Sequence, residues 1–300
     1  MIEAATDALL GARNPEGGWG AEQGKQSNTE TTALAVLALS ALDGSLEQEI
    51  SRGLAWLADR QTADGSWPLR ADMDGSSWTT SLATISLAGF AAHRPGALRG
   101  AHWLIRQEGR RPTWWVSLLQ RWVLPQGPTI RLNPNLKGWP WASGAFSWVE
   151  PTAYALIALK KVRADVAGSE IRERIQQGEM LIYDRMCRGG GWNYGNSNVL
   201  GVDVPPYPET TALALIALQD RQAETANQIS LDALPRMAAD VESGLALSWT
   251  SLCFSIYGRD TSNLRKRLAR TYEKTAFLGA TRTLALAILA WKDGSNGFRV

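Results

Sequence analysis

The sequence predicts an all-α protein in which six or seven helical hairpins close into a ring, an α/α toroid. One observation is a recurring unit, in which a Gly-Trp corner leads through a loop into a helix rich in Thr and Ala. The second is that these helices are apolar on nearly every side, whereas the segments between them carry a charged face. A helix that is apolar all round must be covered on every side. The alternation therefore predicts an inner and an outer layer of helices.

The inner helices are predicted from six copies of the unit. Four copies are well preserved and lie at residues 17–39, 65–87, 138–159 and 190–218, and two weaker copies at 248–256 and 280–291 keep only the helix. In the first three copies a tryptophan precedes the same helix position by eleven residues, as Trp19 precedes Glu30. An insertion lengthens this spacing in the fourth copy. We expect the inner helices to begin at one end of the ring, with their loops gathered around a central cavity.

The outer helices are predicted from amphipathic segments such as LEQEISRGLAWLADRQ (46–61) and SEIRERIQQGEMLIYDRM (169–186). Their apolar residues share one face and their charges the other, which suits a layer with one side in water. The Pro-rich stretch 123–140 is predicted to be a long loop over the ring. Because no linker interrupts the pattern, we predict a single domain over residues 1–300.

Composition excludes several classes of function. The formal charge is +2, and the basic run 263–270 fits a solvated helix face, so nucleic acid is not an expected partner. Cys187 and Cys253 are too few for a disulfide framework and are predicted to be buried thiols. His93 and His102 lie near no cysteine or carboxylate at metal spacing, so we expect neither a metal nor a cofactor.

Localisation is predicted from the absence of targeting signals. The N-terminal sequence has no basic region followed by an apolar stretch, and the apolar segment around Arg282 is too short to span a bilayer. We therefore expect a cytoplasmic protein. The stretch TWWVSLLQRWVL (113–124) leaves two interpretations open. It is either a buried helix or a segment that dips into a membrane surface, which would make the protein peripheral at the membrane.

One copy of the unit carries a specific resemblance. RGLAWLADRQTADGSW (52–67) resembles the QW repeat of squalene-hopene and oxidosqualene cyclases. The matching positions are Arg52, Gly53, Trp56, Leu57, Gln61, Gly65 and Trp67. The segment around Trp19 is similar to the Gly-Gly-Trp-Gly segments of the same family. The resemblance implies the toroid that terpenoid cyclases share with protein prenyltransferase β subunits, with Trp67 clamping an outer helix to the next inner one and Gln61 bonding carbonyls at the helix end.

The resemblance also implies where an acid would lie. Class II terpene cyclases carry an Asp-x-Asp-Asp-Thr-Ala motif whose central acid protonates an alkene or an epoxide. The segments WVEPTA and YPETTA keep the Thr-Ala and place Glu150 and Glu209 at the position of that acid, and NTETTA places Glu30 there. Glutamate replaces aspartate in all three, and no acid stands two residues before it. The metal and thioester sites of related toroids lack their defining residues in this chain.

Acid-initiated cyclisation needs a protonated acid, aromatic faces for the moving cation and a dry cavity. Burial raises the pKa of a carboxyl group and favours its protonated form. We predict Glu150 and Glu209 as catalytic residues, although the helix dipole alone also explains a glutamate at a helix start. The residues predicted to bind substrate are Trp78, Trp139, Trp141, Trp148, Tyr194, Tyr207, Trp249 and, from a loop at 193–208 that could form a lid, Asp203. Trp19, Trp67 and Trp192 are predicted to be structural staples.

Three functions remain open from the sequence. The first is a terpene cyclase-like protein that acts on an isoprenoid or related lipid. The second is a non-catalytic toroid that binds a hydrophobic ligand or a partner protein, and a partner subunit could also supply missing chemistry. The third is an α/α-barrel carbohydrate enzyme with tryptophan platforms and paired carboxyl groups. A sealed aromatic cavity would favour the first, a filled centre the second and an open polar groove the third.

Overall fold

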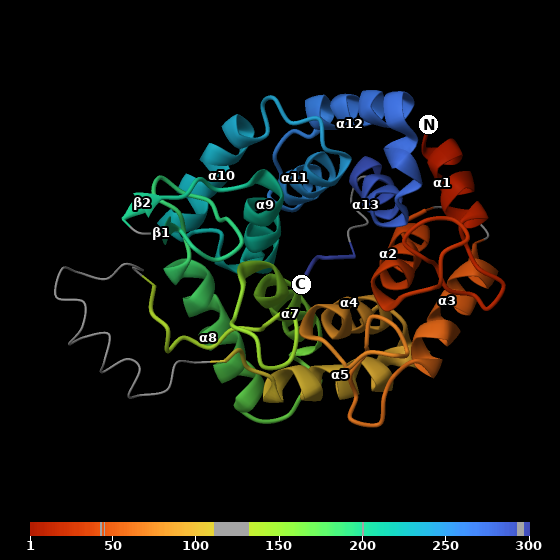
Figure 1. The fold of residues 1–300 in the computed structure, drawn as a ribbon, viewed down its shortest axis with the longest axis horizontal. Helices are drawn as coiled ribbons and strands as arrows, with labels where there is room; N and C mark the ends of the chain where they lie inside the picture. The colour runs from red at the N-terminus through yellow and green to blue at the C-terminus, as the bar shows by residue number, and fades with distance from the viewer. Residues whose placement is uncertain (43, 45, 111–131, 200, 293–296) are drawn as a thin grey trace.

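The computed structural model describes residues 1–42, 44, 46–110, 132–199, 201–292 and 297–300. Within these ranges, twelve α-helices form two concentric layers (Figure 1). The inner helices are α2 (Thr29–Ser40), α4 (Ser77–Ala88), α7 (Val149–Val162), α9 (Pro208–Ala217), α11 (Gly244–Ile256) and α13 (Thr281–Trp291). The outer helices are α1 (Ile2–Gly11), α3 (Glu47–Asp59), α5 (Arg94–Arg106), α8 (Glu170–Asp184), α10 (Thr225–Met237) and α12 (Ser262–Thr275).

The inner layer closes into a ring. Each inner helix contacts the next one along the chain, and α13 contacts α2, which completes the circle. Each outer helix covers one inner neighbour, with α1 lying on α13. At the seam, the Thr281 backbone N–H donates to the Ala21 carbonyl at 2.9 Å. The predicted α/α toroid is confirmed, with six hairpins in the described ranges.

The two layers differ in burial as their sequences predict. In α2 and α9 almost every residue is buried, whereas α12 buries only Leu264 and Leu268 and exposes Lys266, Arg270 and Lys274. The remaining elements are short. They are the 3₁₀ turns η1 (Ala91–His93), η2 (Gln219–Arg221) and η3 (Ala276–Gly279), and a hairpin of β1 (Asn198–Val199) and β2 (Val202–Asp203). The hairpin lies in the loop that precedes α9.

Four tryptophans staple the layers together in the same way. Each backbone N–H donates to a threonine hydroxyl four residues into an inner helix, and each indole N–H donates to a carbonyl near the end of the preceding outer helix. The staples are Trp19, Trp67, Trp139 and Trp192, all fully buried. For Trp67 the partners are Thr80 at 2.9 Å and Leu57 at 2.7 Å. The expected clamp between an outer and an inner helix is therefore present.

The glycine of the QW repeat provides room for the staple. A Cβ added to Gly100 in α5 would lie 2.8 Å from the Trp67 ring, and one added to Gly53 in α3 would lie 3.0 Å from the Trp19 ring. Gln61 acts differently from the prediction. Its amide donates to the carbonyls of Gly65 and Gly96, so it ties the turn to α5 and not to the end of its own helix.

Several other predictions concern single segments. Cys187 and Cys253 are buried free thiols, as expected. The stretch 113–124 and the first half of the Pro-rich loop lie outside the described residues. Of the helices in the described ranges, none combines the length and the apolar character that crossing a bilayer requires.

Candidate functional site

All six inner helices begin at the same end of the ring, which we call the mouth. The second residues of these helices are Glu30, Trp78, Glu150, Glu209, Leu245 and Arg282, and each is half-buried. Their side chains reach across the ring. Arg282 on α13 influences the pKa of Glu150 on α7, although these helices lie on opposite sides of the circle.

Glu30 and Arg282 form an ion pair across the seam of the ring. The Arg282 Nε and a Glu30 carboxylate oxygen are 3.2 Å apart, with 31% and 14% of the two side chains exposed. The two atoms do not meet hydrogen-bond geometry, so both retain bonding capacity. Burial raises the pKa of Glu30, and the Arg282 charge opposes this without cancelling it.

Glu150 is influenced by more negative than positive charges. Burial raises its pKa, Arg282 lowers it, and the charges of Glu209 and Glu30 raise it again, so the net direction is upward. Among the described residues Glu150 has no ion-pair partner within 4.0 Å. The fold therefore favours a proton on this carboxyl group, which is the state that an acid catalyst requires.

Two buried polar groups lie below the mouth. The Tyr154 hydroxyl and the Trp249 indole N–H find no hydrogen-bond partner of good geometry in the described part of the chain, and each residue is 1% exposed. Their rings meet edge to face with centroids 6.0 Å apart. Burial raises the pKa of Tyr154, and Arg282 lies close enough to counteract part of this. Unpartnered buried donors are uncommon in folded proteins and often mark a site that a ligand completes.

Aromatic side chains surround the mouth. Trp78 and Trp141 meet edge to face at 5.5 Å, and Tyr194 and Tyr207 pack at 5.1 Å. Trp148 is 37% exposed and lies against Gly195. The charges of Glu209 and Glu150 both raise the pKa of Tyr194, which places its hydroxyl near the acids, although burial is the larger cause.

The structure brings most predicted residues together, with two exceptions. Trp139 is a staple, since its indole donates to the Leu104 carbonyl and its ring stacks on Arg174 between the layers. Asp203 is partly exposed at the loop surface, where it accepts from Asn198 at 2.8 Å and pairs with Arg188. Trp139 and Asp203 are therefore not among the residues that we assign to the ligand site at the mouth.

Sequence analysis missed Arg282 and Tyr154 as site residues. Arg282 could have been found by repeat register, because it occupies in α13 the position that Glu30 occupies in α2. Tyr154 follows Glu150 by one helical turn on the same face of α7.

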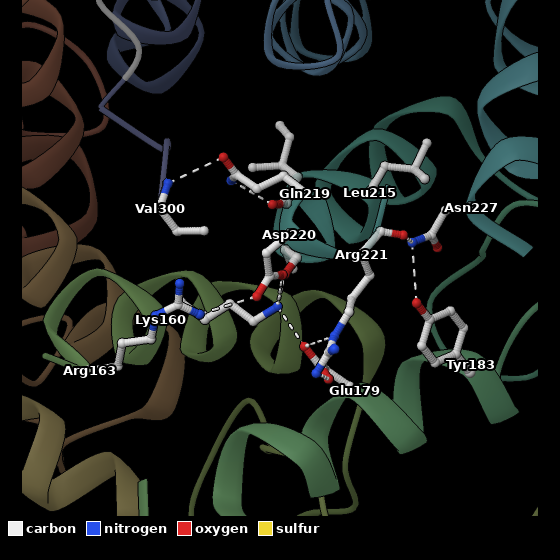
Figure 2. Close-up of polar contacts among 12 residues, drawn as sticks. Lys160, Arg163, Glu179, Tyr183, Leu215, Gln219, Asp220, Arg221, Asn227 and Val300 are labelled. Atoms are coloured by element: carbon white, nitrogen blue, oxygen red, sulfur yellow. Dashed lines mark hydrogen bonds and ion pairs between the residues drawn. The ribbon is translucent and has the colours of Figure 1, made fainter. Parts of the chain in front are cut away.

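The far end of the ring carries a second charged cluster, which Figure 2 shows. The Lys160 side chain is fully buried and its ammonium contacts Asp220 and, at 2.7 Å, Glu179. Arg221 and Arg163 pair with the same two acids at 3.2 and 3.3 Å. This cluster joins α7, α8 and η2, and every charge in it has a partner.

The buried rings of Tyr154 and Trp249 fill part of the interior of the ring. A small cavity of about 70 Å³ lies off the axis, among residues that include Trp56, Arg60 and Pro68. A large ligand at the mouth therefore requires side chains to move, and the long, partly exposed Arg282 side chain is suited to this.

Comparison with known proteins supports the same fold. Residues 2–113 match the Squalene-hopene cyclase N-terminal domain family. An uncharacterized protein of Bradyrhizobium diazoefficiens is 42% identical over 71 residues, which are 21% of this chain and 13% of that protein. The chain therefore aligns with only a small part of this relative.

Two solved structures show how widely the fold is shared. A variant of a type II terpene cyclase from Scytonema, in complex with its product merosterolic acid A, superposes with a TM-score of 0.58 at 16% identity, covering 96% of this chain and 94% of that one. An α-1,6-mannanase of Salegentibacter superposes with a TM-score of 0.59 at 9% identity, covering 96% and 98%. Such low identities establish the fold alone, and the match of residues 2–113 is to a cyclase family, which agrees with the resemblance that the QW repeat carries.

Proposed function

We propose that the protein binds an isoprenoid or related lipid at the mouth and starts its cyclisation by proton transfer from Glu150. The observation that carries this proposal is a half-buried carboxyl group whose pKa is raised, at a mouth whose rim carries two pairs of aromatic side chains. The terpene cyclase-like fold and the cyclase-family match of residues 2–113 support it. The substrate class is carried over from the Scytonema type II terpene cyclase, which has been solved in complex with its substrate geranylgeranyl dihydroxybenzoate.

Glu150 suits the role of acid better than its neighbours. Glu30 is paired with Arg282, whose charge opposes the rise of the Glu30 pKa, whereas Glu150 has no such ion pair among the described residues. Glu150 would donate its proton to an alkene or epoxide, leaving a carbocation on the substrate and a carboxylate that Arg282 stabilises. Trp78, Trp148 and Tyr194 would offer their faces to the cation. Glu209, at the same rim, would take up the proton that ends the reaction.

The test is conversion of a panel of isoprenoids, with native mass spectrometry and product extraction in parallel. The panel contains squalene, farnesyl and geranylgeranyl diphosphates and a polyprenol. We expect a cyclised product from the wild type, and a loss of about 10²–10⁴-fold in rate with binding retained in Glu150→Gln. Glu173→Gln, an exposed change on α8, is the matched control and keeps the rate.

The second candidate function is ligand binding without catalysis. The buried rings inside the toroid and the replacement of aspartate by glutamate favour it. Binding without product, unchanged in Glu150→Gln, would favour this candidate and overturn the cyclase proposal. An α-1,6-linked mannotriose added to the panel tests the carbohydrate alternative, which predicts binding of the sugar and of no isoprenoid.

A further inference from the structure

The segment Gly297–Val300 occupies the central hole at the end opposite the mouth (Figure 1). Phe298 is fully buried, and its ring lies 5.1 Å from that of Trp249. Gly297 packs against α2 so closely that an added Cβ would lie 2.7 Å from Leu37. The segment therefore fills the axis directly below the Tyr154–Trp249 pair.

Side chains of several elements hold this segment in place. Gln219 in η2 donates to the Phe298 carbonyl at 2.9 Å and accepts from the Val300 N–H at 3.2 Å, and Figure 2 shows the second bond. Lys161 on α7 donates to the Arg299 carbonyl at 2.8 Å. Arg299 in turn donates to the Ser255 carbonyl on α11 at 3.0 Å. The segment is thus fixed from three sides, and the Phe298 ring is held against Trp249 on α11.

We infer that Phe298 forms the floor of the ligand site and sets the length of the longest isoprenoid chain that the protein accepts. This inference rests on the proposed function. A ligand that enters at the mouth passes Arg282, then Tyr154 and Trp249, and its apolar end meets Phe298.

Packing physics gives the direction of the effect. A truncated aromatic side chain in a rigid core leaves a cavity that the surroundings fill only in part. Such an apolar cavity stays dry and accepts an apolar group of matching size. Removal of the Phe298 ring would therefore lengthen the site by space that an additional isoprene unit can occupy, and a larger ring would shorten it.

The test measures the affinities of geraniol, farnesol and geranylgeraniol for the wild type and for Phe298→Ala and Phe298→Trp. We expect the ratio of geranylgeraniol to farnesol affinity to rise about tenfold in Phe298→Ala and to fall in Phe298→Trp, because single methylenes already change pocket affinities by this much. Phe277→Ala is the matched control. It removes a buried ring of the same size that packs on Tyr272 and Trp291, away from the axis, and it should leave the ratio unchanged.

The possible outcomes separate this inference from the proposed function. If the prenols bind and their ratio is the same in Phe298→Ala as in the wild type, Phe298 is not the floor, and the proposed ligand class stands. If no prenol binds to any variant, the proposed function and this inference both fall. Should Phe298→Ala not fold, Phe298→Leu and Gln219→Met replace it. Both must shift the ratio in the same direction for the inference to hold.

Discussion

The toroid contains two charged clusters at opposite ends, and they differ in how their acids and cations are paired. The mouth cluster consists of Glu30, Glu150, Glu209 and Arg282, and the anchor cluster consists of Lys160, Arg163, Glu179, Asp220 and Arg221. In the anchor cluster each acid contacts two cations. In the mouth cluster Glu30 and Glu150 share one arginine, Glu209 adds a third negative charge near Glu150, and buried atoms of Glu30 and Arg282 lack hydrogen-bond partners.

The difference indicates which cluster serves the fold and which serves a ligand. A buried charge is stable when it is paired and bonded, as Lys160 is. At the mouth, burial raises the pKa values of Glu30 and Glu150, and the charges of neighbouring acids raise that of Glu150 further. In contrast, Lys160 lowers the pKa of Asp220 although burial opposes it. The anchor cluster also adjoins Gln219, which holds the segment with Phe298.

The largest predicted effect is the loss of the anchor lysine. Lys160→Met should lower the free energy of unfolding by about 3–5 kcal/mol, because it removes a buried cation and leaves the buried Glu179 and the partly exposed Asp220 short of positive charge. Denaturant unfolding at neutral pH measures this. A loss below about 1 kcal/mol would mean that the ion pairs of Lys160 stabilise the fold no more than exposed surface pairs do.

Two comparisons sharpen that result. Arg163→Gln removes a half-exposed partner of Asp220 and should cost no more than about 0.5 kcal/mol. Arg282→Met is the matched change in the mouth cluster. It should cost less than Lys160→Met, because Glu30 and Glu150 can take up protons when the arginine is gone.

The second prediction concerns the pH dependence of stability. The folded protein raises the pKa of Glu150 above its usual value of 4.5, so it binds this proton more tightly than the unfolded chain does. Glu150 therefore stabilises the fold most below about pH 4.5, and this contribution is lost as pH rises through the raised pKa. Glu150→Gln should leave the Tm nearly unchanged at about pH 4 and raise it by about 2 °C at about pH 7.5.

Calorimetry at both pH values, with Glu173→Gln as the exposed control, checks this second prediction. A Tm that falls at about pH 7.5 and stays unchanged at about pH 4 would mean that the Glu150 carboxylate makes a stabilising contact. The mouth cluster would then resemble the anchor cluster, and the proposed acid would lose its basis.

The ring could be predicted from the sequence because it depends on local spacing. Trp67, the turn at Gly65 and the threonine at Thr80 lie within sixteen residues, and the bonds of Trp67 repeat in the four well-preserved copies. The same Gly-Trp corner marks Trp19 and Trp192 as staples. It also places Trp139 among them, although its aromatic neighbours favoured a place in the cavity.

The mouth could be predicted only in part, because its contacts cross the ring. Glu150 and Glu209 were found by their place at helix starts. Arg282 lies more than a hundred residues from Glu150, and only closure of the ring brings them together. Phe298 belongs to no repeat, so no periodicity could have placed it beside Trp249. Long-range contacts of this kind leave no local pattern in a single sequence.

The smallest predicted effect tests whether the buried hydroxyl at the mouth is unpartnered. Tyr154→Phe should change the free energy of unfolding by less than about 0.5 kcal/mol, because the hydroxyl group has no well-formed hydrogen bond to lose. Tyr257→Phe is the matched control near the far end, where the hydroxyl donates to the Leu215 carbonyl at 2.8 Å and its removal should cost about 1 kcal/mol. Equal losses in the two variants would mean that Tyr154 already has a partner within the fold. If Tyr154→Phe leaves the free energy of unfolding unchanged but weakens the binding of a prenol, the Tyr154 hydroxyl forms a hydrogen bond with the ligand's oxygen.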